Sequence, residues 1–224
     1  MSDAALVSWI TAALGRAPGD AALYRRALTH GSHGGDTYER LEFLGDRVLG
    51  LVAAAWLYER FPDEPEGALS RRINAIVSRE TCAEVGRAIG VPAHLRLGKQ
   101  ARDDGAVDSD NVVGDVVEAL IGALFLEGGL AAATAFVRTN WSGRVEAQAQ
   151  APRHPKSALQ EWAAAHRCRA PVYTLDARTG AHHAPRFTVS VALPGRADAV
   201  ATAEGSSKQE AETAAARALL EKLS

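Results

Sequence analysis

The feature that most constrains the fold is a change in hydrophobic periodicity about two-thirds of the way along the chain. Up to about residue 142, apolar residues recur at helical spacing in at least five segments, and turn-forming residues separate these segments. The next stretch, 143–155, is small, polar and proline-ended, as is typical of linkers. We therefore predict a mainly α domain at 1–147, a linker at 148–153 and a second domain at 154–224.

The second domain has the pattern of a small α+β fold. A helical pattern covers 157–166, and alternating residues at 172–175, 186–193 and 197–203 predict three strands. An alanine-rich segment at 208–220 predicts a final helix. The predicted order is α-β-β-β-α.

Charge differs between the two parts of the chain. Residues 1–150 carry 15 basic and 20 acidic side chains, net −5, whereas 151–224 carry 10 basic and 7 acidic, net +3. A basic module is a candidate for binding a polyanion, so the two parts are expected to have different partners.

Several observations favour a cytoplasmic protein without a membrane segment. The N-terminal residues lack the basic start and cleavage site of a secretory signal. The longest nearly apolar run, 48–57, is far shorter than the roughly 20 residues that cross a bilayer. Cys82 and Cys168 suggest neither a disulfide framework nor a zinc site and are expected to be thiols in a reducing cytosol.

Two stripes of carboxylates are the most informative part of the first domain. On a helix, Glu39, Glu42 and Asp46 fall within about 60° of one another, beside a broad apolar arc. Asp115 and Glu118 form a second stripe, three residues apart. Acids at such spacing are also common on solvated helix faces, and that alternative applies to either stripe alone.

Small residues beside the second stripe indicate how the two helices meet. Ala119 and Gly122 share the sector of Asp115 and Glu118, so another helix backbone can come close there. We infer that this helix packs against the helix predicted at 39–58. The contact would bring four carboxylates together, those of Glu42, Asp46, Asp115 and Glu118.

The composition of this predicted site indicates its chemistry. Four carboxylates without histidine or cysteine make an oxygen-only site, which favours Mg²⁺ or Mn²⁺ over Zn²⁺. Mg²⁺ retains waters and usually meets phosphate oxygens, so hydrolysis of a phosphodiester by an activated water is the natural reaction. No small-molecule cofactor is expected.

The segment 39–46, Glu-Arg-Leu-Glu-Phe-Leu-Gly-Asp, closely resembles the signature of the ribonuclease III family. Residues 24–30 resemble the helix that precedes this signature, and residues 114–122 resemble the second acidic motif of the family. The resemblance implies a helical endonuclease domain that cuts double-stranded RNA. It departs from the usual pattern at Gly31, where arginine is frequent, and at Arg47, where serine is frequent.

The resemblance also implies roles for individual residues. Glu42, Asp46, Asp115 and Glu118 would hold the metal, and Asp46 and Glu118 would be the pair most needed for cleavage. Family members are homodimers whose two sites line one valley across a duplex, and their products carry 5′-phosphates and short 3′ overhangs. By a weaker match, Phe43 would contact the partner copy and Glu66 would line the valley. The implied substrates are structured precursors of ribosomal RNA and some messenger and transfer RNAs.

The predicted second domain is similar to the double-stranded RNA-binding domain. The matching segments are 155–161, 182–187 and 205–212. Such domains recognise the shape of A-form RNA through 2′-hydroxyls and phosphates, so little sequence specificity is expected.

The resemblance assigns RNA contacts to three parts of this domain, with the residues Gln160, Glu161, His183, Ser207 and Lys208. Gln160 and Glu161 suit 2′-hydroxyls, and Ser207 and Lys208 lie where a helix start favours phosphate. His183 would reach a neighbouring minor groove, or else His182 and His183 are ordinary loop residues. Gln209 and Glu210 stand where the family often has basic residues, which would weaken RNA binding.

Two other readings of the chain remain. One is a non-catalytic protein that binds double-stranded RNA through a degenerate nuclease fold, and the other is a helical scaffold for proteins. His30 and His33 are interpreted as capping or packing residues. Four tryptophans are interpreted as core residues, namely Trp9, Trp56, Trp141 and Trp162.

Overall fold

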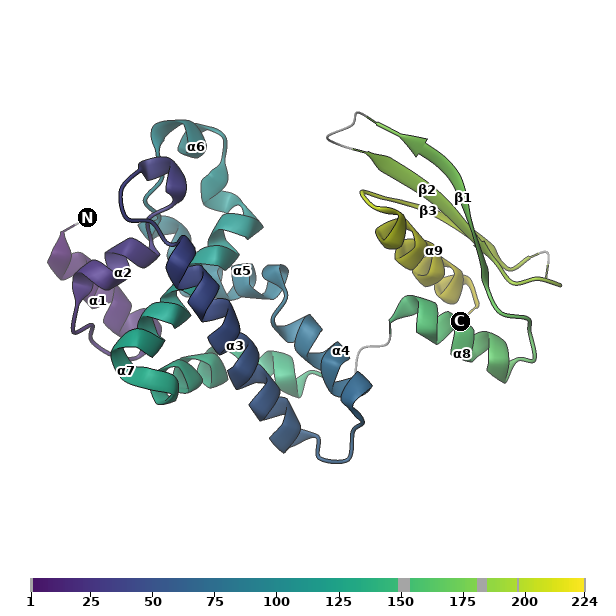
Figure 1. The fold of residues 1–224 in the computed structure, drawn as a ribbon, viewed down its shortest axis with the longest axis horizontal. Coiled ribbons are helices and arrows are strands. Elements are labelled where there is room, and N and C mark those ends of the chain that lie inside the picture. Colours follow the sequence, from purple (N-terminus) through teal and green to yellow (C-terminus); the bar gives the residue numbers. More distant parts are fainter. Residues whose placement is uncertain (1, 149–153, 181–184, 197, 224) are drawn as a thin grey trace. The chain divides into compact units, whose positions relative to one another are not determined.

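The structure is a computed structural model that describes residues 2–148, 154–180, 185–196 and 198–223. The chain forms two compact units, 1–152 and 153–224. The first unit is helical, and the second combines a sheet with helices (Figure 1). The linker predicted at 148–153 lies outside the described residues except for Gln148.

The first unit is built from α-helices and short 3₁₀ turns. The α-helices are α1 (Asp3–Leu14), α2 (Ala21–Ala27), α3 (Glu39–Arg60), α4 (Glu66–Ile76), α5 (Arg79–Ala88), α6 (Lys99–Asp103) and α7 (Asp110–Glu146). The 3₁₀ turns are η1 (Gly31–His33), η2 (Val91–His94) and η3 (Ala106–Asp108). Asp20 and Ser78 cap α2 and α5 by accepting a backbone N–H, as these residue types favour at helix starts.

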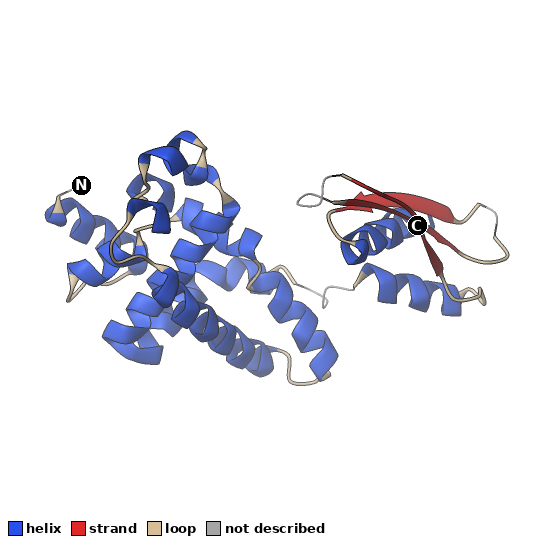
Figure 2. Ribbon diagram, turned by 45° about the horizontal axis from the view of Figure 1, so that its top comes forward, coloured by secondary structure: helices blue, strands red, loops and turns tan. Residues whose placement is uncertain are grey.

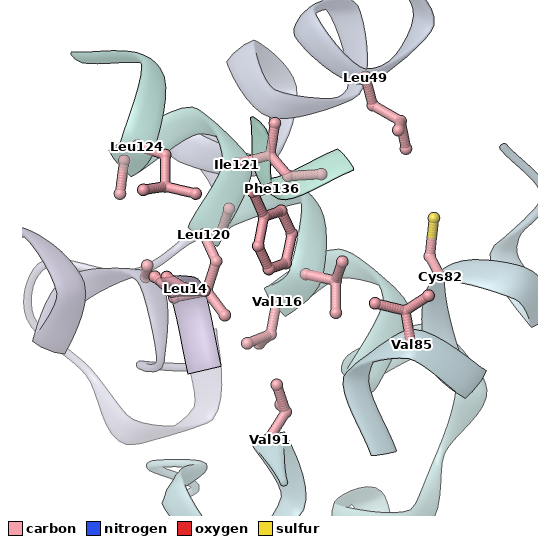
Figure 3. Close-up of a cluster of buried hydrophobic side chains, with 14 of the residues drawn as sticks. Leu14, Leu49, Cys82, Val85, Val91, Val116, Leu120, Ile121, Leu124 and Phe136 are labelled. Carbon is pink, nitrogen blue, oxygen red and sulfur yellow. The ribbon is translucent and has the colours of Figure 1, made fainter. Parts of the chain in front are cut away.

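The core of this unit lies around α7. Val116, Leu120 and Ile121 of this helix are fully buried, and side chains from α1, α3 and α5 pack around them (Figure 3). By length and composition α7 could span a bilayer. Gly129, with φ of 66°, interrupts the helical backbone of α7. Buried apolar residues of α7 lie on both sides of this kink. We therefore regard α7 as a core helix.

The second unit has the predicted α-β-β-β-α order. Its elements are α8 (Pro155–Ala165), β1 (Val172–Thr179), β2 (Arg186–Ala192), β3 (Val200–Gly205) and α9 (Lys208–Leu223). The strands form an antiparallel sheet in the order β1-β2-β3, and both helices cover one face of it (Figure 2). Val189 and Val191 of the central strand are buried beneath the helices, together with Leu159 and Leu219.

Several predicted boundaries were wrong by a few residues. The helix α7 ends at Glu146, within the domain predicted at 1–147, and Val145 near its end is buried in the core. The strand β1 continues four residues beyond Leu175, past a bulge at that point. The strand β3 begins at Val200 and not at 197, and just before it the Ala199 carbonyl oxygen accepts a hydrogen bond from the Leu193 N–H at 3.0 Å.

The interpretations of His30, the tryptophans and the cysteines agree with the structure, whereas the side chain of His33 is exposed. The Nδ1 atom of His30 accepts the Ser32 N–H at 3.0 Å and caps η1. Trp141 is buried, and the other three tryptophans are partly buried against the two hydrophobic cores. Cys82 and Cys168 are both free thiols.

Candidate metal centre and RNA-binding face

The candidate metal centre lies where α3 crosses α7. Gly45 of α3 and Gly122 of α7 allow the two backbones to touch. A Cβ atom on Gly45 would lie 1.7 Å from the carbonyl oxygen of Glu118, and one on Gly122 would lie 2.3 Å from that of Leu41. The close approach predicted from Ala119 and Gly122 is therefore present, and the contribution of Gly45 was missed.

Three of the four predicted carboxylates meet at this crossing. One oxygen each from Glu42, Asp115 and Glu118 can be chosen so that all three lie within 4.8 Å of one another. Asp46, one turn further along α3, lies outside this group and is paired with Arg47. Glu39 is also outside this group, and its carboxylate accepts a hydrogen bond from Thr37.

The electrostatics of the cluster are those of crowded, half-buried acids. Burial, and after it the charges of Asp46, Asp115 and Glu42, together raise the pKa of Glu118 to about 8. The pKa of Glu42 is also raised, by burial and then by Asp115 and its other acidic neighbours. A cation held between these oxygens would relieve both the repulsion and the loss of solvation.

Two residues beside the acids were missed by sequence reasoning. The Tyr38 hydroxyl donates to Asp115 Oδ2 at 3.3 Å, and Arg79 at the start of α5 contributes a positive charge that opposes the raised pKa of Asp115, whose main cause is burial. Tyr38 directly precedes the signature segment, which is the signal that could have found it. Arg79 joins the site only through the packing of α5 on α7.

An exposed apolar feature lies on another face of α3. The Phe43 side chain is 64% exposed, and the Arg47 guanidinium stacks over its ring at 4.7 Å. Beside it is a cavity of about 520 Å³, which Phe43 lines together with Leu44 and the exposed Leu126. Glu66 lies elsewhere, in the first turn of α4, and accepts the Ser70 hydroxyl at 2.6 Å.

The predicted RNA contacts of the second unit that the structure describes lie on α8 and at the start of α9. A cavity of about 590 Å³ opens there, and its lining includes Gln160 and Lys208. Ser207 Oγ accepts the Glu210 N–H at 3.1 Å, so this hydroxyl caps α9. Glu161 is an exposed residue of α8, and His183 falls outside the described residues.

Comparison with known proteins places these features in a family. Residues 20–144 match the family described as ribonuclease-III-like, and residues 155–223 match the double-stranded RNA binding motif. Ribonuclease 3 of Zymomonas mobilis is 60% identical, over 99% of this chain and 89% of the relative. The chain belongs to the ribonuclease III family. Its family fold is a helical nuclease domain followed by an α-β-β-β-α RNA-binding domain.

Other ribonuclease III proteins give the same result. Ribonuclease 3 of Rhodopseudomonas palustris is 45% identical, over 92% of this chain and 77% of the relative. The crystal structure of the nuclease domain of the Campylobacter jejuni enzyme has a TM-score of 0.58 and 29% identity, covering 61% of this chain and 95% of that one. A second structure of the Campylobacter domain is described as showing flexibility in a region involved in dimer formation.

Proposed function

We propose that this chain is an endonuclease that hydrolyses double-stranded RNA with Mg²⁺, for which Mn²⁺ can substitute. Glu42, Asp46, Asp115 and Glu118 are the proposed ligands, and Asp46 and Glu118 the residues most needed for cleavage. The observation that carries the proposal is the convergence of Glu42, Asp115 and Glu118 within 4.8 Å at a helix crossing. An oxygen-only donor set of this kind suits a hard divalent cation.

The side chains divide the work at this site. A bound divalent cation supplies an activated water and neutralises charge on the phosphodiester. Glu42, Asp115 and Glu118 provide anionic oxygens, while the Tyr38 hydroxyl holds Asp115 in place. Because the pKa of Glu118 is about 8 without metal, its carboxyl carries a proton near neutral pH. A cation would compete with this proton for the Glu118 carboxylate, so the affinity for metal is expected to rise with pH.

A homodimer fits the face of α3 opposite the core. Phe43 is an exposed aromatic side chain beside a cavity on the same face, and a two-fold interface needs both a projection and a recess in one surface. In such a dimer each of two sites would cut one strand, giving 5′-phosphates and short 3′ overhangs. Glu66 is proposed to line the valley between the sites. The nuclease domain of the Campylobacter protein is described as having a region involved in dimer formation, which supports a dimer for this chain.

The second unit is proposed to hold the substrate. Gln160, Glu161, Ser207 and Lys208 are the proposed RNA contacts, with His183 as a further one. The domain would recognise duplex shape and not base sequence, because side chains cannot read the deep major groove of A-form RNA. We place the protein in the cytoplasm, where it would process precursors of ribosomal RNA and some messenger and transfer RNAs.

One assay separates this proposal from the two alternatives. Purified protein is incubated with long double-stranded RNA in the presence and absence of Mg²⁺, and the RNA is examined on denaturing and native gels. The proposed enzyme shortens the RNA only with metal. A non-catalytic binding protein would shift the duplex uncut, although none of the four carboxylates that such a protein would be expected to lose is missing here. A helical scaffold would do neither.

A further inference from the structure

One carboxylate of the second unit faces two lysines: Lys208, a proposed RNA contact, and Lys156, which lines the same cavity. Lys156 Nζ, at the start of α8, donates to Glu212 Oε2 at 2.5 Å. Lys208 Nζ, at the start of α9, lies 3.9 Å from Glu212 Oε1. All three residues line the cavity of about 590 Å³ between the two helix starts, where His154 and Gln160 are also found.

The three side chains differ in how firmly they are held. The Glu212 side chain is only 16% exposed, against 34% for Lys156 and 62% for Lys208. Lys156 also lies over the Tyr173 ring, with its Nζ 4.8 Å from the centroid. Glu212 and Lys156 thus form a partly buried pair, and Lys208 is an outer cation within reach of the same carboxylate.

We propose that Glu212 competes with RNA phosphate for these lysines and so sets the affinity of the module. This inference rests on the proposed binding of duplex RNA by the second unit. A phosphate that contacts Lys156 or Lys208 must displace or share the carboxylate, and the negative charge of Glu212 lowers the positive potential of the cavity. Glu212 is thus an affinity-determining residue, although its carboxylate need not contact RNA itself.

The sequence around the cavity strengthens the effect. The first turn of α9 continues from Lys208 to Gln209 and Glu210, so no second cation follows to offset the carboxylate. Each phosphate neutralised by a protein cation releases counterions, which makes binding salt-dependent. With Glu212 in place, the module is expected to gain less from this release than its lysines would allow.

The test is a salt titration of duplex binding by the full chain. Glu212→Gln is compared with the unsubstituted protein on a duplex RNA somewhat longer than the roughly 16 bp that such a domain spans, without divalent metal so that no cleavage occurs. Glu212→Gln should bind about 3- to 10-fold more tightly at low salt, and the slope of log K against log salt should steepen by about one unit. Glu221→Gln removes the same charge from an exposed position of α9 and should change neither quantity appreciably.

Two further variants keep the test decisive. Glu212→Ala repeats the experiment should the glutamine variant fold poorly, and Lys156→Gln should weaken binding. If Glu212→Gln and Glu212→Ala bind like Glu221→Gln, the inference is wrong. It is equally wrong if they lose affinity as Lys156→Gln does, because Glu212 would then serve only to position Lys156. A wild-type chain that does not bind duplex at any salt would overturn the proposed RNA-binding role of the unit, and this inference with it.

Discussion

At Glu118, burial and three neighbouring carboxylates all act in one direction on a single side chain. Together they raise its pKa to about 8, far above the ordinary value near 4.3. Acids are placed in such surroundings at functional sites more often than elsewhere, because the cost to the fold is offset when a ligand binds. Glu118, whose charged form is strongly disfavoured without metal, is thus one of the proposed metal ligands.

The raised pKa of Glu118 predicts that the free energy of unfolding depends on pH. A carboxyl whose folded pKa is raised contributes stability below its unfolded pKa, and that contribution is lost as the pH rises towards 8. In the absence of metal, thermal melts should show the Tm of the wild type falling between about pH 5 and pH 8 relative to Glu118→Gln. Added Mg²⁺ at pH 8 should raise the wild-type Tm and raise that of the variant much less. If Tm changed with pH in the same way in the wild type and in Glu118→Gln, the raised pKa of Glu118 would be contradicted.

At the residue scale, the sequence was informative about the acids and silent about their neighbours. The spacing of Glu42 and Asp46, and of Asp115 and Glu118, can be seen in the sequence because it repeats on a helix. The roles of Tyr38 and Arg79 depend on packing between segments far apart in the chain. Periodicity carries no information about such contacts.

At the scale of elements, the site depends on two glycines that let α3 and α7 touch. Without them the helix backbones would stand apart, since helix axes are usually 8–10 Å from each other and side chains set the distance. The backbone of Glu118 itself forms part of the contact with Gly45. The positions of the acidic side chains therefore depend directly on how closely α3 and α7 pack.

Substitution of Gly45 should disturb both the packing of α3 on α7 and the arrangement of the acids. In Gly45→Ala the new Cβ would overlap the Glu118 carbonyl, so we expect a loss of several kcal/mol in the free energy of unfolding and of most cleavage activity. Gly143→Ala is the control, because its Cβ would enter open space on α7. There the higher helix propensity of alanine should stabilise by up to about 1 kcal/mol. Denaturant unfolding and RNA cleavage measure the two effects, and equal stability of both variants would refute the role of the contact.

Element types were easier to predict than element ends. The α-β-β-β-α order was correct because alternation and helical spacing differ clearly in the second unit. The bulge in β1 after Leu175 was not predictable, because the pairing with β2 decides it. Boundaries are where local propensities are weakest.

At the scale of the whole molecule, the structure shows which charged residues are buried and which apolar residues are exposed, and composition cannot show this. Arg72 is 1% exposed, although arginine is normally a surface residue. Its guanidinium forms two hydrogen bonds to Glu64, stacks 3.6 Å from the Phe61 ring and donates to the backbone oxygen of Gln148 at 2.6 Å. Only the assembled fold shows that this side chain, far from Gln148 in the sequence, binds its backbone.

The exposed Phe43 leads to a prediction about assembly. If its ring inserts into a partner copy, Phe43→Glu should convert a dimer to a monomer and strongly reduce cleavage of both strands. Val172→Glu adds the same charge at an exposed apolar position of β1 and should leave the dimer intact. Light scattering after size-exclusion chromatography measures the mass. A Phe43→Glu variant that remains dimeric would place the interface elsewhere.

The most direct measurement of the central claim compares cleavage with binding in Glu118→Gln. This substitution preserves the size of the side chain and removes one anionic oxygen from the cluster. With Mg²⁺ and long double-stranded RNA, the wild type should cut the substrate, whereas the variant should bind the duplex and leave it intact. Cutting by Glu118→Gln at the wild-type rate would contradict the assignment of the metal centre to the crossing of α3 and α7.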